Sequence, residues 1–68
     1  MIDEWIQDYL QRIRKCRTVD ELADEFYEIR LEYGERLNCL YEEEMDIFSD
    51  RFEEVEDLFN RMMDGMLI

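Results

Sequence analysis

The chain contains no histidine and no proline, and it has only two glycines and two cysteines among its 68 residues. Without histidine there is no Ser–His–Asp or Cys–His catalytic site, and the commonest general base and the imidazole metal ligand are missing as well. Glycine-rich phosphate-binding loops and paired-cysteine zinc motifs are also absent from the sequence. We therefore do not expect an enzyme, a bound metal or a cofactor.

The two cysteines, Cys16 and Cys39, are too few for the dense disulfide framework of a small secreted domain. The first residues show no signal-peptide pattern, and no apolar run is long enough to span a bilayer. These features predict a cytoplasmic protein without a membrane partner, whose thiols are reduced and packed as small hydrophobic groups. One disulfide between the two cysteines stays open as an alternative. Arg14, Lys15 and Arg17 beside Cys16 are of the kind that lower the pKa of a thiol.

Positive charge is scarce, because twenty acidic residues face eight basic ones and the net charge is −12. Residues 1–17 hold four of the bases and three acids, whereas the remainder holds four bases and seventeen acids. This imbalance disfavours direct binding to duplex DNA, which rests on neutralising phosphates, and it favours a basic protein surface as partner. The alternative explanation is that the negative charge serves only to keep the protein soluble.

Apolar and aromatic residues are abundant, at 47% and 13% of the chain, which is enough for a compact core. They recur every three or four positions, and alternating strand patterns are absent. We predict an all-α protein in which residues 1–68 form one small domain, a bundle of three to four helices. A domain of this length is marginal alone, so a partner or self-association is an expected source of stability.

Charges and capping residues delimit the first two predicted helices. The first, residues 2–15, begins with acids and ends with bases, an order that complements the helix dipole. Thr18 and Glu21 fit a capping box at the start of the second helix. Gly34 and Gly65 are both predicted to be C-terminal caps, so the second helix is expected to end just before Gly34.

The third helical region, predicted to span residues 35–63, carries an apolar stripe with alternating spacings of three and four. The residues of this apolar stripe are Met45, Phe48, Phe52, Val55, Phe59, Met62 and Met66. Two interpretations are open: the stripe packs as core against the other helices, or it projects beyond them and joins a second copy in a homodimer. Ser49 and Asp50 leave open whether the region is one long helix or two shorter ones.

The segment from Asp8 to Leu22 resembles the opening helix and turn of the Hha/YmoA family, small bacterial modulators that associate with the nucleoid protein H-NS. The residues that carry the likeness are Asp8, Tyr9, Leu10, Arg12, Arg14, Lys15, Cys16, Thr18, Asp20 and Leu22. The resemblance implies a non-catalytic helical bundle that binds the amino-terminal region of H-NS through acidic residues. It also implies that Asp46 occupies one acidic contact position of the family, whereas another such position falls on Ala23.

We predict a non-catalytic regulatory protein of the Hha type that docks an acidic helical surface on a basic nucleoid-associated or other DNA-binding protein. The residues predicted to bind this partner are Asp20, Asp24, Glu25, Glu42, Glu43, Asp46, Asp50 and Glu53. One alternative is an acidic DNA mimic, such as a phage-encoded inhibitor of host defence, and another is a structural homodimer built on the apolar stripe. The bases from Arg12 to Arg17 are predicted either to stabilise the end of the first helix or to touch DNA.

Overall fold

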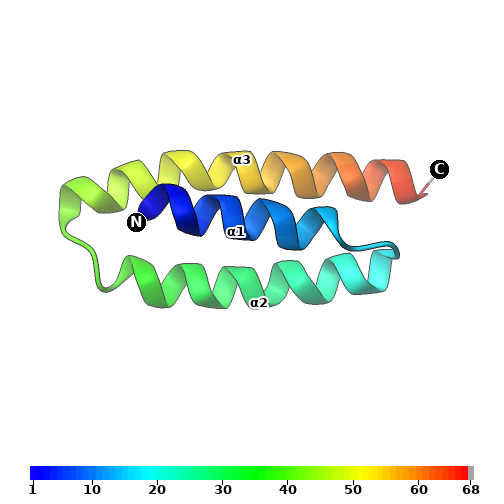
Figure 1. The fold of residues 1–68 in the computed structure, drawn as a ribbon, viewed down its shortest axis with the longest axis horizontal. Coiled ribbons are helices and arrows are strands. Elements are labelled where there is room, and N and C mark those ends of the chain that lie inside the picture. The colour runs from blue at the N-terminus through cyan, green and yellow to red at the C-terminus, as the bar shows by residue number, and fades with distance from the viewer. Residues whose placement is uncertain (68) are drawn as a thin grey trace.

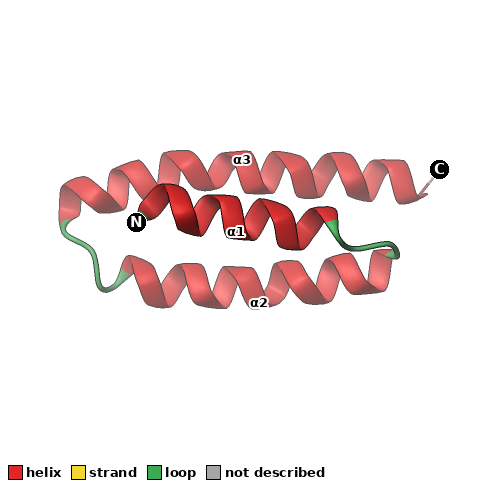
Figure 2. Ribbon diagram, viewed as in Figure 1, coloured by secondary structure: helices red, strands yellow, loops and turns green. Residues whose placement is uncertain are grey.

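The computed structural model describes residues 1–67, and three α-helices account for most of them (Figure 1). These are α1 (Ile2–Arg14), α2 (Val19–Leu37) and α3 (Glu42–Leu67), which two short connections join (Figure 2). α2 runs antiparallel to both α1 and α3, and the bundle is a rod with extents of 40 × 16 × 15 Å (Figure 1). No β-strand occurs among the described residues, so the predicted all-α bundle is confirmed, with three helices.

The capping box predicted at the start of α2 forms, with one difference from the usual pattern. The backbone N–H of Glu21 donates to Thr18 Oγ1 at 3.1 Å. The Glu21 carboxylate accepts from the backbone N–H of Arg17 at 3.0 Å, one residue earlier than the capping-box partner would be. Two backbone donors are thus satisfied within five residues, and the connection between α1 and α2 is held tight.

The two glycines lie inside helices, so their predicted role as caps is wrong. α2 continues through Gly34 to Leu37, and Gly65 lies within α3. Neither glycine has a positive φ, the conformation that a glycine cap adopts. The extra turn of α2 packs the half-buried Leu37 against the core, and this burial offsets the roughly 1 kcal/mol that glycine costs inside a helix.

α3 is one continuous helix that begins at Glu42 rather than at residue 35. The possible interruption at Ser49 and Asp50 does not occur. The Ser49 hydroxyl shares a hydrogen bond of 2.8 Å with the Tyr33 hydroxyl on α2, so it does not compete for the backbone of its own helix. None of the three helices is apolar over a stretch that would cross a membrane, as far as the described residues extend.

The core runs along the bundle axis and receives side chains from all three helices. The buried residues are Ile6, Tyr9, Leu10, Ile13, Leu22, Ile29, Phe48, Phe52 and Val55. Phe52 stacks on the Tyr33 ring with centroids 4.0 Å apart and meets the Tyr9 ring edge-on at 6.1 Å. The core is therefore centred on aromatic contacts between α3 and the other two helices.

The apolar stripe of α3 packs within the chain. Phe48, Phe52 and Val55 are buried, and Met45 is half-buried at the N-terminal end. The residues that pack against this core from its edge are Phe59, Met62 and Met66. Phe48, Phe52 and Val55 thus pack as core within the chain, whereas a homodimer through the half-buried residues of the stripe stays a prediction.

Candidate functional site

Some acids pair with arginines in the structure, and others make no ion pair within the described part of the chain. The paired acids are Asp3, Asp8, Glu25, Glu32 and Glu54. Their partners are Arg12, Arg36 and Arg51, and Arg51 joins α3 to Asp3 near the start of α1. Three of the eight bases are therefore committed to contacts within the bundle.

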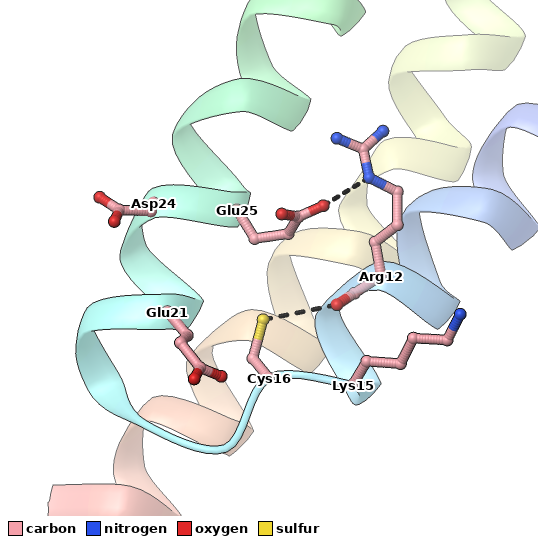
Figure 3. Close-up of a pocket in the computed structure, with 6 residues that line it drawn as sticks. All are labelled: Arg12, Lys15, Cys16, Glu21, Asp24 and Glu25. Carbon is pink, nitrogen blue, oxygen red and sulfur yellow. Dashed lines mark hydrogen bonds and ion pairs between the residues drawn. The ribbon is translucent and has the colours of Figure 1, made fainter.

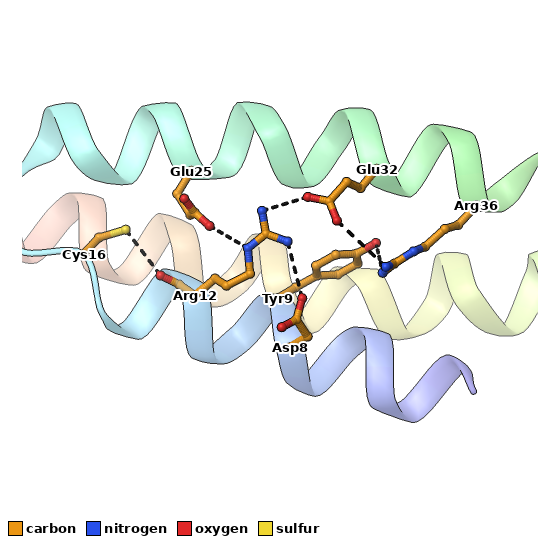
Figure 4. Close-up of polar contacts among 7 residues, drawn as sticks. All are labelled: Asp8, Tyr9, Arg12, Cys16, Glu25, Glu32 and Arg36. Atoms are coloured by element: carbon orange, nitrogen blue, oxygen red, sulfur yellow. Dashed lines mark hydrogen bonds and ion pairs between the residues drawn. The ribbon is translucent and has the colours of Figure 1, made fainter.

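Arg12 contacts three carboxylates, one on its own helix and two on α2, and the two on α2 join the helices (Figure 4). Arg12 Nε donates to Glu25 at 2.5 Å, while Nη2 lies 2.8 Å from Glu32 and Nη1 3.3 Å from Asp8. The hydrogen bond between Arg12 and Glu32 raises the pKa of Arg12 further above its usual range and lowers the pKa of Glu32. Because its side chain is only 23% exposed and turned toward α2, Arg12 stabilises the fold and is not available to touch DNA.

Arg36 extends this network along α1 (Figure 4). Its Nη1 donates to the Tyr9 hydroxyl at 2.8 Å, and its guanidinium lies 4.8 Å from the centroid of the Trp5 ring. Burial raises the pKa of the Tyr9 hydroxyl even though Arg36 and Arg12 act in the opposite direction. The buried end of Tyr9 thus has its polar partner, and Arg36 covers two aromatic rings by cation–π contact.

The remaining bases of the first segment, Arg14, Lys15 and Arg17, are exposed. Arg14 belongs to the last turn of α1, where positive charge complements the helix dipole. No ion pair to these three side chains occurs within the described residues. Of the four bases between residues 12 and 17, Arg12 therefore joins two helices and the other three face solvent.

Cys16 lies in a shallow hollow at the turn between α1 and α2 (Figure 3). The hollow is lined by Arg12, Lys15, Cys16, Glu21, Asp24 and Glu25. The thiol donates to the Arg12 carbonyl at 3.4 Å, and burial, with Glu25 and Glu21 nearby, raises its pKa. The neighbouring bases Arg14, Lys15 and Arg17 therefore do not lower the pKa of this thiol, because burial and the two carboxylates raise it and the Lys15 ammonium points away (Figure 3). A raised pKa disfavours the reactive thiolate.

The two cysteines lie at opposite ends of α2, and both are free. The 19 residues of that helix span about 28 Å at 1.5 Å per residue. A disulfide requires Cα atoms within about 7 Å. The alternative of a bridge between Cys16 and Cys39 in one chain is therefore wrong.

Exposed acids line the side of α3 opposite the core. With about 3.6 residues per turn, the buried stripe places five acids on the outer side: Glu43, Asp46, Asp50, Glu53 and Asp57. All five are exposed, and none lies within ion-pair distance of a base among residues 1–67. We call this set the α3 acidic face. Arg61, one turn beyond Asp57, marks its end.

Seven of the eight acids predicted to bind a partner are exposed, but they do not form one surface. Four belong to the α3 acidic face: Glu43, Asp46, Asp50 and Glu53. Glu42 precedes them in the first turn of α3, whereas Asp20 and Asp24 lie on the outer side of α2. Glu25 differs from the rest because it accepts from Arg12 at the contact between α1 and α2. In the part of the chain that the structure describes, no three acid or cysteine side chains converge as metal ligands do.

Two exposed apolar residues on α2 were not predicted. Tyr27 and Leu31 are 66% and 54% exposed and lie one helical turn apart. A signal was present in the sequence, because both fall on the side opposite the buried Leu22 and Ile29. The reasoning from spacing missed them because it assigned apolar residues to the core side alone.

No family model matches the chain, and no curated protein or solved structure matches it either. The likeness of residues 8–22 to the Hha/YmoA family stays a prediction. Within the bundle, residues that carry the likeness have structural roles: Arg12 pairs with α2, Thr18 caps it and Leu22 is buried. Function is consequently inferred from the exposed residues of this molecule.

Proposed function

We propose that this protein is a non-catalytic binding protein that docks the α3 acidic face on the basic surface of a nucleic-acid-binding protein. An H-NS-type nucleoid protein is the first candidate partner, in keeping with the resemblance of residues 8–22. The observation that carries the proposal is the α3 acidic face itself, five exposed carboxylates in a line without a paired base. These charges contrast with the acids between α1 and α2, which the bundle neutralises internally.

The energetics of α3 support this proposal. Neighbouring acids on the face are three or four residues apart, a spacing at which like charges on a helix repel by about 0.2–0.5 kcal/mol per pair. Four such pairs from Glu43 to Asp57 cost the free protein roughly 1–2 kcal/mol. A cationic partner surface removes this repulsion, so part of the binding energy comes from relief within α3.

The test compares two variants that change the net charge equally. Asp46→Asn with Asp50→Asn alters the α3 acidic face, whereas Glu4→Gln with Glu56→Gln removes two exposed acids that lie outside it. Both are titrated calorimetrically with the purified amino-terminal region of an H-NS-type protein at low and at physiological salt. We expect the first variant to bind about tenfold more weakly than the second, with a smaller salt dependence. Equal affinities, or no binding of the parent at low salt, would contradict the proposal.

A second candidate function is mimicry of nucleic acid by the same face. The acids rise about 4.5–6 Å from one to the next along the helix axis, the same order as the ~3.4 Å of axial rise per phosphate in one DNA strand. Adding duplex DNA to the complex separates the two functions. Displacement of this protein by DNA indicates mimicry, whereas a ternary complex indicates a modulator that binds beside DNA.

A further inference from the structure

The outer side of α2 carries an apolar pair that folding does not use. Tyr27 and Leu31 are adjacent on the helix surface, and the exposed Ala23 lies one turn before them. The core side of α2 is already filled by Leu22 and Ile29, both fully buried. The pair therefore leaves two large apolar side chains in water, next to each other instead of scattered singly.

Acids surround this pair. The exposed acids on the outer half of α2 are Asp20, Asp24, Glu28 and Glu35. None of the four pairs with a base in the described part of the chain, and Arg30 is an exposed base on the flank of the same helix. The surface thus combines an apolar centre with a negative rim. On α3, in contrast, Ile47 is the one large apolar residue that is exposed within the described part of the chain, and it lies beside the α3 acidic face without an apolar neighbour.

We propose that the outer side of α2, centred on Tyr27 and Leu31, is a docking site for a basic amphipathic helix of the partner protein. This proposal rests on the proposed function and adds the chemistry of the contact. A large apolar side chain of the partner packs on the pair, while its lysines or arginines approach Asp24 and Glu28. A second copy of this chain is a poor occupant, because its own acids would face the same rim and both copies carry a charge of −12.

The two surfaces act at different stages of binding. The α3 acidic face attracts the partner across about one Debye length, ~8 Å at physiological salt, so its charges mainly raise the association rate. The apolar pair acts only after water has left the contact, so it mainly slows dissociation. Helix α2 therefore sets how long the complex lasts, and α3 sets how quickly it forms.

Two synthetic peptides test the site without knowledge of the partner. One is a helical peptide of lysine and leucine with its leucines on one side, and the other replaces each leucine with serine at equal charge. Each is titrated into the isotopically labelled protein, and amide chemical shifts are followed by NMR. We expect the lysine–leucine peptide to bind about tenfold more tightly and to shift the amides of Tyr27 and Leu31. The lysine–serine peptide is expected to shift only residues near exposed acids.

Two variants test whether the tighter binding of the leucine peptide depends on the apolar pair of α2. Tyr27→Ser with Leu31→Ser is expected to abolish the advantage of the leucine peptide and to leave binding of the serine peptide unchanged. Tyr41→Ser removes an aromatic residue that is 83% exposed elsewhere, and it is expected to change neither affinity. Equal binding of both peptides to the parent, or dimerisation that the double variant abolishes in sedimentation, would overturn the docking site. Failure of the serine peptide to perturb α3 would instead count against the proposed function.

Discussion

Replacing Arg12 by glutamine is expected to lower the free energy of unfolding by about 2 kcal/mol. The change removes three ion pairs, of which those to Glu25 and Glu32 join side chains that are 23–35% exposed. Such half-buried pairs contribute about 0.5–1 kcal/mol each, and the pair with the more exposed Asp8 contributes about 0.3 kcal/mol. The carboxylates of Glu25 and Glu32 also lose their main hydrogen-bond donor, and this accounts for the rest of the expected loss in free energy of unfolding.

Thermal unfolding followed by circular dichroism measures this loss directly. For a domain of this size, 1 kcal/mol corresponds to roughly 4–8 °C in melting temperature, so Arg12→Gln should melt about 8–16 °C below the parent. Arg14→Gln is the matched control, because it removes the same charge from an exposed residue two positions away. Its effect should stay within about 0.5 kcal/mol.

Arg12→Lys tests the geometry of the contact. Lysine keeps the charge, but its compact ammonium cannot reach three carboxylates at once. This variant should therefore melt between the parent and Arg12→Gln. Equal melting temperatures for Arg12→Gln and Arg14→Gln would show that the three ion pairs add no net stability.

Three further predictions concern the core, acid stability and the thiols. Phe52→Ala should cost about 3–5 kcal/mol, because the ring is 4% exposed and contacts both other helices, and loss of the far-UV helical signal checks this. Because its pKa is lowered, Glu32 stabilises the fold fully at neutral pH, and this effect declines once the pH falls below the ordinary value of 4.5 and toward the lowered pKa. Urea unfolding should therefore separate the parent from Glu32→Gln more at pH 7 than at pH 3. Iodoacetamide should modify the exposed Cys39 faster than Cys16, whose pKa is raised, and mass spectrometry that shows the reverse order would contradict the half-buried placement of Cys16.

The helices and the start of α2 were predictable because their signals are local. Thr18 and Glu21 are three residues apart, and the contact between them depends on that spacing alone. The end of α2 was not predictable in the same way. Gly34 is a helix-ending signal by itself, but Leu37 gains enough burial against the core to carry the helix past it.

The candidate surface was predicted in part. Exposure of the acids on α3 follows from their position opposite the apolar stripe, which spacing reveals. The position of Tyr27 and Leu31 opposite the core side of α2 also follows from spacing. The internal pairing of Glu25 does not, because it depends on which side of α2 the other helices cover, and that arrangement exists only in the assembled bundle.

The amphipathic helical pattern, the cap at Thr18 and a strongly negative surface follow from the sequence, because each depends on neighbours within one or two turns or on composition alone, whereas the count of three helices does not. The tertiary structure alone decided what each charge does. Arg12 and Glu25 are thirteen positions apart, and only the packing of α1 on α2 brings them within hydrogen-bond distance. The same packing turned part of the basic segment into a structural contact and left the outer acids of α2 and α3 facing solvent, where a basic partner can reach them.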